Sequence, residues 1–462
     1  MSGARTLNPA DAGPEMEAIA ARALDAAKQA GATHVEVVVQ HGRAFSVKVQ
    51  GGHIDTLKQS SAHGLGLRVL VGQKIGFVST TDFRADALDD LARRAVALAA
   101  FATEDEANAF ATTVEAGEAP VQDLGLYDPA VLALAPEGKI EMAMTLEKLA
   151  LAHDPRILRT DGAGVSSHDG ASLLANSHGL SRFETGTSAS FYVVPLAGDR
   201  DGKQQGGYFS VASRSLAGLP ALEDAATEAA ARAVARIGAR TVPSARVPVV
   251  MHPDVAGAWI AEIHGAFSGE AIIKQESWLT GKLGQTVASP LVTLVDDGVK
   301  PGAVGSSLYD GEGNAARRNV LIDRGRCAMF LYDLYHARRA GTRSTGSAVR
   351  SYGSTPGIGS FNLYVEPGAD SPEAILAKVD RGFYMDDQGA YGFNDVTGDY
   401  SFQAQGFWIE KGEKAFPVEG VTVASNSLEM LKHVAAVGND LRFLHSVASP
   451  TVLIAEMTVS GT

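Results

Sequence analysis

The sequence predicts an α+β protein in two parts. The first, residues 1–243, is expected to be an N-terminal α/β domain with a mostly antiparallel sheet flanked by helices. The second, residues 244–462, is expected to be a β-rich C-terminal domain with a barrel-like or rolled sheet. Three observations predict this: 462 residues exceed one ordinary hydrophobic core, proline and small residues cluster at 240–246, and turn residues dominate afterwards.

In the N-terminal half, apolar residues at helical spacing predict a helix over residues 14–30 that ends before Gly31. The following segment is rich in β-branched residues and has turn signals at Gly51-Gly52 and around 71–73, so four or five strands are expected. The run ADALDDLARRAVALAAFA predicts a second amphipathic helix. Helix, antiparallel strands and helix together are typical of an α+β domain.

Two more helices, over 136–153 and 221–239, enclose a second series of strands punctuated by Asp-Gly and His-Gly turns. Beyond the predicted boundary, a short helix is expected at 253–264. Short β-rich runs such as NVLIDRGRCAMFLY and TVLIAEMTVS predict the C-terminal sheet. Helices around 328–340 and 371–383 are expected to pack outside it.

Composition excludes several classes of protein. The net charge is −13, so a surface built to neutralise phosphate backbones, and hence nucleic acid as a partner, is not expected. No apolar run is long enough for a membrane span, and the N-terminus lacks a secretory signal pattern. The single cysteine, Cys327, rules out an internal disulfide and is expected to be a small buried residue. The sequence therefore predicts a soluble, cytoplasmic protein.

The stretch AWIAEIHGAFSGE, residues 258–270, ends an apolar run with a lone histidine, His264. A zinc hydrolase of the HExxH type needs two histidines on one helical face and a glutamate that activates water. Glu262 lies only two residues from His264, and such residues point to different sides of a helix. His264 and Glu262 are tentative catalytic candidates, and no metal site is expected here.

Other side chains are candidates for substrate binding, each with a simpler structural alternative. Arg317 and Arg318 could pair with a peptide carboxylate, or with nearby acids. Asp399 and Tyr400, in TGDYS, are a second candidate pair, with Asp399 expected to be a buried, hydrogen-bonded carboxylate of structural or functional role. Four acidic residues could hold a hard cation but more often make turns: Asp296, Asp297, Asp310 and Glu312. The pattern Gly64-Leu65-Gly66 lacks the context of a dinucleotide loop.

Several segments resemble the TldD/PmbA family, the peptidase-like "modulator of DNA gyrase" proteins. The resemblance lies in HGAFSGEAIIKQESWLTGKLGQTVASPLVTLVDDG, in LYDGEGNAARRNVLIDRGRCAMFLYDLYHARRAGTRSTGSA and in DVTGDYSFQAQGFWIEKGEKAFPVEGVTVASNSLEMLKHVAAVGND. In the N-terminal half, GLGLRVLVGQKIGFVSTTDF and LLANSHGLSRFE fit the same pattern. The segments recur in order over nearly the whole chain.

The resemblance distinguishes two arms of that family. In the TldD arm, an HExxxH helix and a later cysteine are thought to bind zinc and cleave peptides. The TldE/PmbA arm lacks these ligands and partners a TldD-type subunit. When His264 is aligned with the second histidine of HExxxH, Trp259 and Ile260 stand where the first histidine and the glutamate should be. No cysteine follows in the downstream segment, so this chain resembles the TldE/PmbA arm.

The resemblance implies a non-catalytic subunit that needs no cofactor of its own and works with a TldD-type zinc subunit on peptides or unfolded protein segments. Zinc would be held only by that partner. Two alternatives stay open. One is an independent hydrolase with a reorganised site around His264 and Glu262. The other is a peptide-binding homodimer without catalysis in any assembly.

Overall fold

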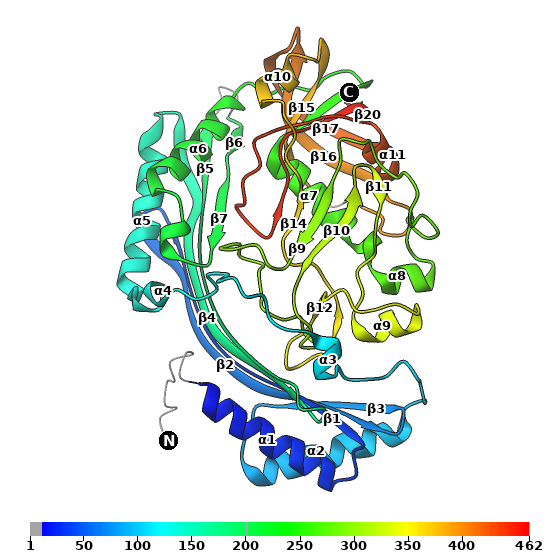
Figure 1. Ribbon diagram of the computed structural model, residues 1–462. Helices are drawn as coiled ribbons and strands as arrows, with labels where there is room; N and C mark the ends of the chain where they lie inside the picture. Colours follow the sequence, from blue (N-terminus) through cyan, green and yellow to red (C-terminus); the bar gives the residue numbers. More distant parts are fainter. Residues whose placement is uncertain (1–11, 199–201, 391, 462) are drawn as a thin grey trace.

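The computed structural model describes residues 12–198, 202–390 and 392–461 (Figure 1). Its N-terminal half is organised by one long, curved sheet with strand order β3-β2-β1-β4-β5-β6, in which β7 also pairs with β5 and every pairing is antiparallel. The strands are β1 (His34–Gln50), β2 (His53–Val71), β3 (Lys74–Thr80), β4 (Ile157–Asn176), β5 (Ser181–Gly198), β6 (Gln204–Gly206) and β7 (Phe209–Ser213).

The prediction of four or five strands between the first two long helices is wrong in number, because there are three. Residues 34–50 form one strand, in which His41 and Gly42 are extended like their neighbours. Their pairing with both β2 and β4 continues across that point without interruption. Hydrogen bonding on both sides therefore keeps the whole segment in one strand.

The long helices cover the convex face of this sheet, and the concave face looks toward the C-terminal half (Figure 1). One pair packs under the β1–β2–β3 end, with Val35, Val37 and Val39 of β1 in the shared core. A second group covers the other end, where the alternate residues Phe45, Val47 and Val49 lie in a separate core. The helices of this half are α1 (Gly13–Gln29), α2 (Ala85–Phe101), α3 (Thr113–Ala116), α4 (Pro129–Ala133), α5 (Pro136–His153) and α6 (Leu222–Ala235). The short α3 lies on the concave side, where Ala116 packs with Val38 and Leu174 (Figure 1).

The C-terminal half contains a closed five-stranded barrel, formed because β17 pairs with both β16 and β20. Its strands are β8 (Ala245–Met251), β15 (Arg381–Gln388), β16 (Asp399–Glu410), β17 (Glu413–Asn426) and β20 (Val452–Ser460), with β18 (Val434–Val437) added to β20. The predicted α+β class, with an antiparallel N-terminal sheet and a barrel-like C-terminal sheet, is confirmed. The predicted boundary at residues 243/244 stays a prediction.

A second, smaller sheet lies beside the barrel, with the order β11-β10-β9-β14-β19. Its strands are β9 (Leu294–Asp297), β10 (Arg318–Asp323), β11 (Arg326–Cys327), β14 (Leu363–Val365) and β19 (Val447–Ala448), and a separate hairpin joins β12 (Ala348–Val349) to β13 (Gly357–Ile358). The C-terminal helices are α7 (Pro253–Ile263), α8 (Gly269–Lys274), α9 (Leu334–Arg339), α10 (Pro372–Leu376) and α11 (Ser427–Lys432).

The expected helices over 328–340 and 371–383 are shorter than predicted, since α9 and α10 each span about one and a half turns. Residues 381–383 instead begin β15, which enters the barrel between β8 and β16. Barrel pairing thus overrides the helical pattern at that point. In the described part of the chain, no helix is both long and apolar enough to cross a membrane.

Candidate functional site

Helix α7 carries the histidine singled out in the sequence. Pro253 opens the helix, and His252 caps it by accepting a hydrogen bond from the Asp254 backbone at 3.1 Å. The helix ends at Ile263, and His264 begins a 3₁₀ turn that runs to Phe267. His264 is half-buried, and its Nδ1 lies 3.2 Å from the Ala261 carbonyl oxygen.

The helix positions that the family resemblance assigns to a zinc ligand and a general base lie inside the hydrophobic core. Trp259 and Ile260 are 1% and 0% exposed, and the indole of Trp259 donates to the Ser427 hydroxyl at 3.2 Å. Cys327 belongs to the same core, and burial raises the pKa of its thiol to about 11. The prediction of a small buried cysteine is confirmed.

Glu262, His264 and Tyr400 lie near one another at the end of α7. Burial raises the pKa of Glu262, the Asp395 carboxylate raises it further and His264 opposes both. Tyr400 is buried, its hydroxyl donates to Gln388 Oε1 at 2.7 Å, and burial followed by the charge of Glu262 raises its pKa. This cluster combines two carboxylates, Glu262 and Asp395, with one histidine.

A catalytic zinc site requires three protein ligands. Within the described residues, no group of three or more His, Cys, Asp or Glu side chains is placed to hold a metal ion. An indole and an aliphatic side chain supply no zinc donor where the HExxxH pattern requires one, so the residues of α7 do not fit zinc.

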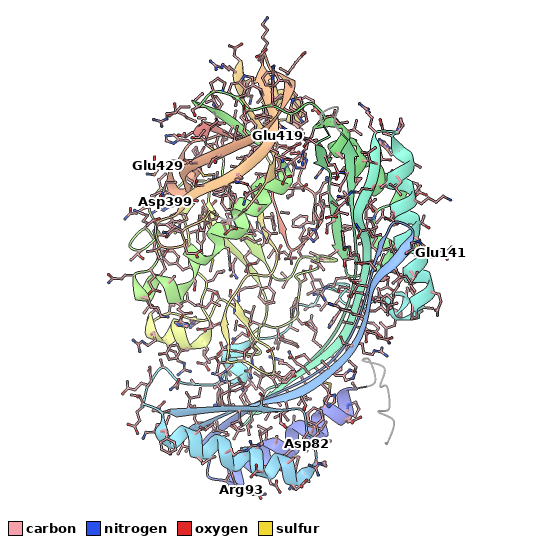
Figure 2. All side chains as sticks on the ribbon, turned by 180° about the vertical axis from the view of Figure 1, so that it is seen from behind. Asp82, Arg93, Glu141, Asp399, Glu419 and Glu429 are labelled. Atoms are coloured by element: carbon pink, nitrogen blue, oxygen red, sulfur yellow. The ribbon has the colours of Figure 1, made fainter. Side chains whose placement is uncertain are left out.

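The remaining sequence candidates are scattered over the surface. Arg317 and Arg318 are both exposed, and Arg318 Nη2 pairs with Glu366 Oε1 at 2.5 Å. Asp399 is hydrogen-bonded, as expected, to Thr397 Oγ1 at 2.7 Å and Asn426 Nδ2 at 3.0 Å. The expectation that it is buried is wrong, because it anchors an exposed turn at the start of β16 (Figure 2). The structure therefore does not bring Asp399 together with the two arginines.

The four acidic residues considered for a hard cation hold loops in place instead. Asp296 accepts from the Phe361 backbone at 2.7 Å, and burial raises its pKa to about 7. Asp310 accepts from the backbones of Glu312 and Asn314, each at 2.9 Å, and burial raises its pKa to about 6. The Asp310 contacts are the turn contacts that Asp-Gly segments favour, whereas the Asp296 contact joins two segments that are 65 residues apart.

The cleft between the concave face and the C-terminal half contains residues that are not among the sequence candidates. The segment 350–354 crosses it as a strap, here called the cleft strap. Arg350 forms a buried ion pair with Glu36 of β1, and the Tyr352 backbone donates to Gln40 Oε1 at 2.8 Å. A Cβ added to Gly64 would lie 2.1 Å from the Tyr352 ring, so this glycine lets the strap lie against β2.

Two pockets of about 250 and 340 Å³ line this cleft and share Gln40, Ser172 and Glu184. Burial raises the pKa of Glu184, whose carboxylate accepts from the Ser307 hydroxyl at 2.9 Å. Beside them, Gly42, Gly170 and Gly186 form one row across β1, β4 and β5. All three glycines line the larger pocket, where a Cβ added to Gly42 would lie 3.1 Å from the His168 ring. In the sequence, the signal for this row was a glycine within each of the three strand segments.

Comparisons with known proteins agree with this architecture. Family models described as PmbA/TldA metallopeptidase domain 1, central domain and C-terminal domain match residues 35–99, 130–237 and 244–461. The chain is 28% identical over 427 residues to "Metalloprotease PmbA" of Escherichia coli O157:H7, covering 92% of each chain. It is 28% identical to the "Metalloprotease PmbA homolog" of Haemophilus influenzae over 441 residues, 95% of this chain and 94% of that one.

Solved structures show the same fold. A putative modulator of DNA gyrase from Thermotoga maritima superposes with a TM-score of 0.88 at 25% identity, covering 96% of this chain and all of that chain. TldE from Thermococcus kodakarensis superposes with a TM-score of 0.87 at 24% identity, over 96% of this chain and 100% of that one. From the three matched domains and the nearly full-length relatives, we conclude that this chain belongs to the PmbA/TldD family of metallopeptidases.

Proposed function

We propose that this chain is the TldE/PmbA-like subunit of a two-chain metallopeptidase of the cytoplasm. In this proposal the chain holds no zinc of its own. It binds an extended peptide or an unfolded protein segment and presents it to a TldD-type subunit, which carries the zinc and cleaves the peptide bond. Relatives bearing both PmbA and TldD names, together with a TldE structure of the same fold, support this assignment.

The observation that carries the proposal is the burial of α7. Trp259 and Ile260 point into the hydrophobic core and have no donor for a metal and no group that can move a proton. A general base must lie within hydrogen-bond reach of the proton that it removes. A chain of this design contributes to peptide cleavage by positioning the substrate, which is a substantial part of enzymatic rate enhancement.

The cleft under the strap is the proposed place for the peptide. An extended chain is recognised through its main chain, and glycines let another backbone approach a sheet closely. The row Gly42, Gly170 and Gly186 offers such an approach, with Gln40, Ser172 and Glu184 beside it as polar contacts. The surface candidates Arg317, Arg318 and Asp399 are outside these pockets, so we assign substrate positioning to the cleft residues.

The first test is the zinc content of the untagged chain, purified without added zinc or chelator and measured by mass spectrometry. We expect less than about 0.1 zinc per chain, because a stable site needs three or four protein ligands. About one zinc per chain would overturn the proposal and direct mutagenesis to His264.

The second test is peptide cleavage by the chain alone and after mixing with a TldD-type subunit. Turnover is expected only in the mixture. Loss of turnover on chelation, and its return with zinc, would assign the metal to the partner. One observation favours the alternative of an independent hydrolase, which is the raised pKa of Glu262 beside His264. That alternative requires activity in the isolated chain that His264→Ala abolishes.

A further inference from the structure

A pocket on the convex face of the sheet, far from α7 in the sequence, contains a buried lysine without a counter-ion. The pocket has a volume of about 290 Å³ and lies between α4, α5 and the strands β1, β2 and β4. Lys139 of α5 lines it and is 7% exposed. Its ammonium donates to the Ser167 hydroxyl at 2.7 Å and lies 5.1 Å from the centre of the Phe45 ring.

No acidic residue contacts Lys139, although the charge of Asp169 opposes the lowering of its pKa by burial. Asp169, the acid on the same wall, pairs with Arg43 at 2.9 Å. Glu141, two residues along α5, is exposed on the outer side of the helix (Figure 2). Among the residues that the structure describes, no carboxylate lies within 4.0 Å of the Lys139 ammonium. A buried ammonium with three donors and one hydrogen bond is costly unless an anion completes it.

Two further features make the pocket attractive to an anion. Arg43 contributes a second cation, so Lys139, Arg43 and Asp169 together carry one net positive charge in a chain whose net charge is −13. The pocket also lies at the beginning of α5, where Ala135 and Pro136 form part of its wall and no side chain caps the helix. An uncapped helix N-terminus presents free N–H groups and a partial positive charge.

The remaining walls suit a carboxylate attached to an apolar residue. Val131, Leu132 and Leu134 supply apolar surface from α4 and the segment that follows it. The opposite wall is formed by residues 59–61 of β2. There β2 has an open edge, because β3 pairs only with residues 65–71 and the described residues offer no other neighbour to 53–63. An open edge is a template for main-chain pairing with an extended peptide.

We propose that this pocket binds the C-terminal residue of an extended peptide, with the peptide α-carboxylate on Lys139, Arg43 and Ser167. The small apolar side chain of that residue packs against Leu132 and Leu134, and the preceding main chain pairs with the open edge of β2. The choice of a peptide as ligand rests on the proposed function. The site itself lies on the sheet face opposite the cleft and is separate from α7.

The test is calorimetric titration of the full chain with N-acetyl-Ala-Ala-Val and with the same peptide carrying a C-terminal amide. We expect the acid to bind at least about tenfold more tightly than the amide, because hydrogen bonds to a charged group in a partly buried site are the strong ones. Lys139→Met should remove this preference, and Ser167→Ala should weaken it. Lys148→Met is the matched control, because Lys148 lies on the same helix and is exposed.

Equal binding of acid and amide would overturn the proposal, as would an unchanged preference in Lys139→Met that is folded by circular dichroism. Inorganic phosphate is the third probe. If it displaces the peptide at equal concentration, the peptide assignment is wrong and the pocket is a general anion site. The titration needs no partner subunit. If the titration shows no preference for the acid while the mixture still cleaves peptides with zinc, this pocket assignment is wrong and the proposed function is unaffected. If the titration shows the preference while the mixture does not cleave peptides, the proposed function is wrong and the pocket assignment is unaffected.

Discussion

Two groups of buried charges lie on opposite faces of the same sheet, and they differ in how their charges are matched. On the concave face, Glu36 pairs with Arg68 at 2.9 Å and with Arg350, and Glu312 lies 3.8 Å from Arg68. On the convex face, Lys139 has a hydroxyl partner and no carboxylate. We call the concave cluster matched because both of its arginines contact the Glu36 carboxylate directly, so its contacts connect parts of the fold. Lys139 is unmatched because no carboxylate contacts it, which leaves its ammonium free to bind a ligand.

The matched cluster joins the two halves of the chain. Glu36 and Arg68 are cross-strand neighbours on β1 and β2, and Arg350 reaches them from the cleft strap. Removing one partner of a buried ion pair leaves a charge without compensation, which is far more costly than never having buried the pair. We therefore regard Arg350 as the residue that fixes the strap across the cleft.

The largest effect is expected for Arg350→Met. Glu36 would keep only Arg68, and the free energy of unfolding should fall by about 3 kcal/mol. Urea denaturation followed by circular dichroism measures this. Arg343→Met, at an exposed arginine seven residues earlier in the chain, should stay within about 0.5 kcal/mol of the natural chain. Equal losses in both variants would show that the ion pair with Glu36 does not hold the strap.

The second prediction uses pH to sharpen the same comparison. Burial raises the pKa of Glu312 to about 8, against the opposing charge of Arg68. A raised pKa in the folded state favours folding below pH 4.5, and this stability is lost as pH rises through 8. Glu312→Gln keeps an acceptor for the Leu334 backbone, which Glu312 binds at 2.7 Å. It should remove most of the fall in the free energy of unfolding between pH 5 and 8.

The measurement is the free energy of unfolding at pH 5, 6.5 and 8 for both chains. Glu410→Gln, at the exposed end of β16, is the control and should keep the natural pH dependence. If Glu312→Gln has the same slope as the natural chain, Glu312 does not titrate in this window and the concave cluster is ionised throughout.

The third prediction concerns the fit of the strap against the sheet. A Cβ at Gly64 would meet the Tyr352 ring at 2.1 Å, so Gly64→Ala must displace the ring. Overpacking of this kind costs about 1–3 kcal/mol. Gly357→Ala, where a Cβ would meet nothing within 4 Å, is the matched control. Hydrogen exchange of residues 350–354 should rise in Gly64→Ala alone, and protection equal to the natural chain would mean that Tyr352 does not depend on this glycine.

Local periodicity was sufficient to predict the long elements. The pattern at 136–153 predicted α5 with its observed bounds, and the helical run at 253–264 predicted α7. The same reasoning predicted four or five strands where the structure has three, because cross-strand pairing keeps the whole of β1 extended. Local patterns predict whether an element is a helix or a strand. They predict less well whether a strand is continuous, because pairing with strands distant in sequence decides this.

The candidate site was only partly predictable, again because some of its contacts join residues that are distant in sequence. His264 was located at the end of α7, and the apolar character of Trp259 and Ile260 was visible in the sequence. The strap was not predictable as a contact, because Arg350 and Glu36 are 314 residues apart and neither residue type indicates the other. Asp399 was misjudged because a Thr-Gly-Asp turn looks the same in sequence whether it is buried or exposed.

The smallest effect is expected for Lys139→Met, which tests the buried lysine that has no carboxylate contact. Lys139→Met removes a buried charge without a counter-ion, so it should stabilise the chain by about 1 kcal/mol, as uncharged replacements of buried charges often do.

Burial lowers the pKa of Lys139, which means that the folded state disfavours its protonated form. The cost is therefore largest at neutral pH and disappears as pH rises toward 10.5. In thermal unfolding, the gain in stability of Lys139→Met should therefore become smaller as pH rises. Lys148→Met should show neither the gain in stability nor its dependence on pH. A loss of stability in Lys139→Met would instead mean that this lysine is matched within the fold, and the contrast between the two faces would disappear.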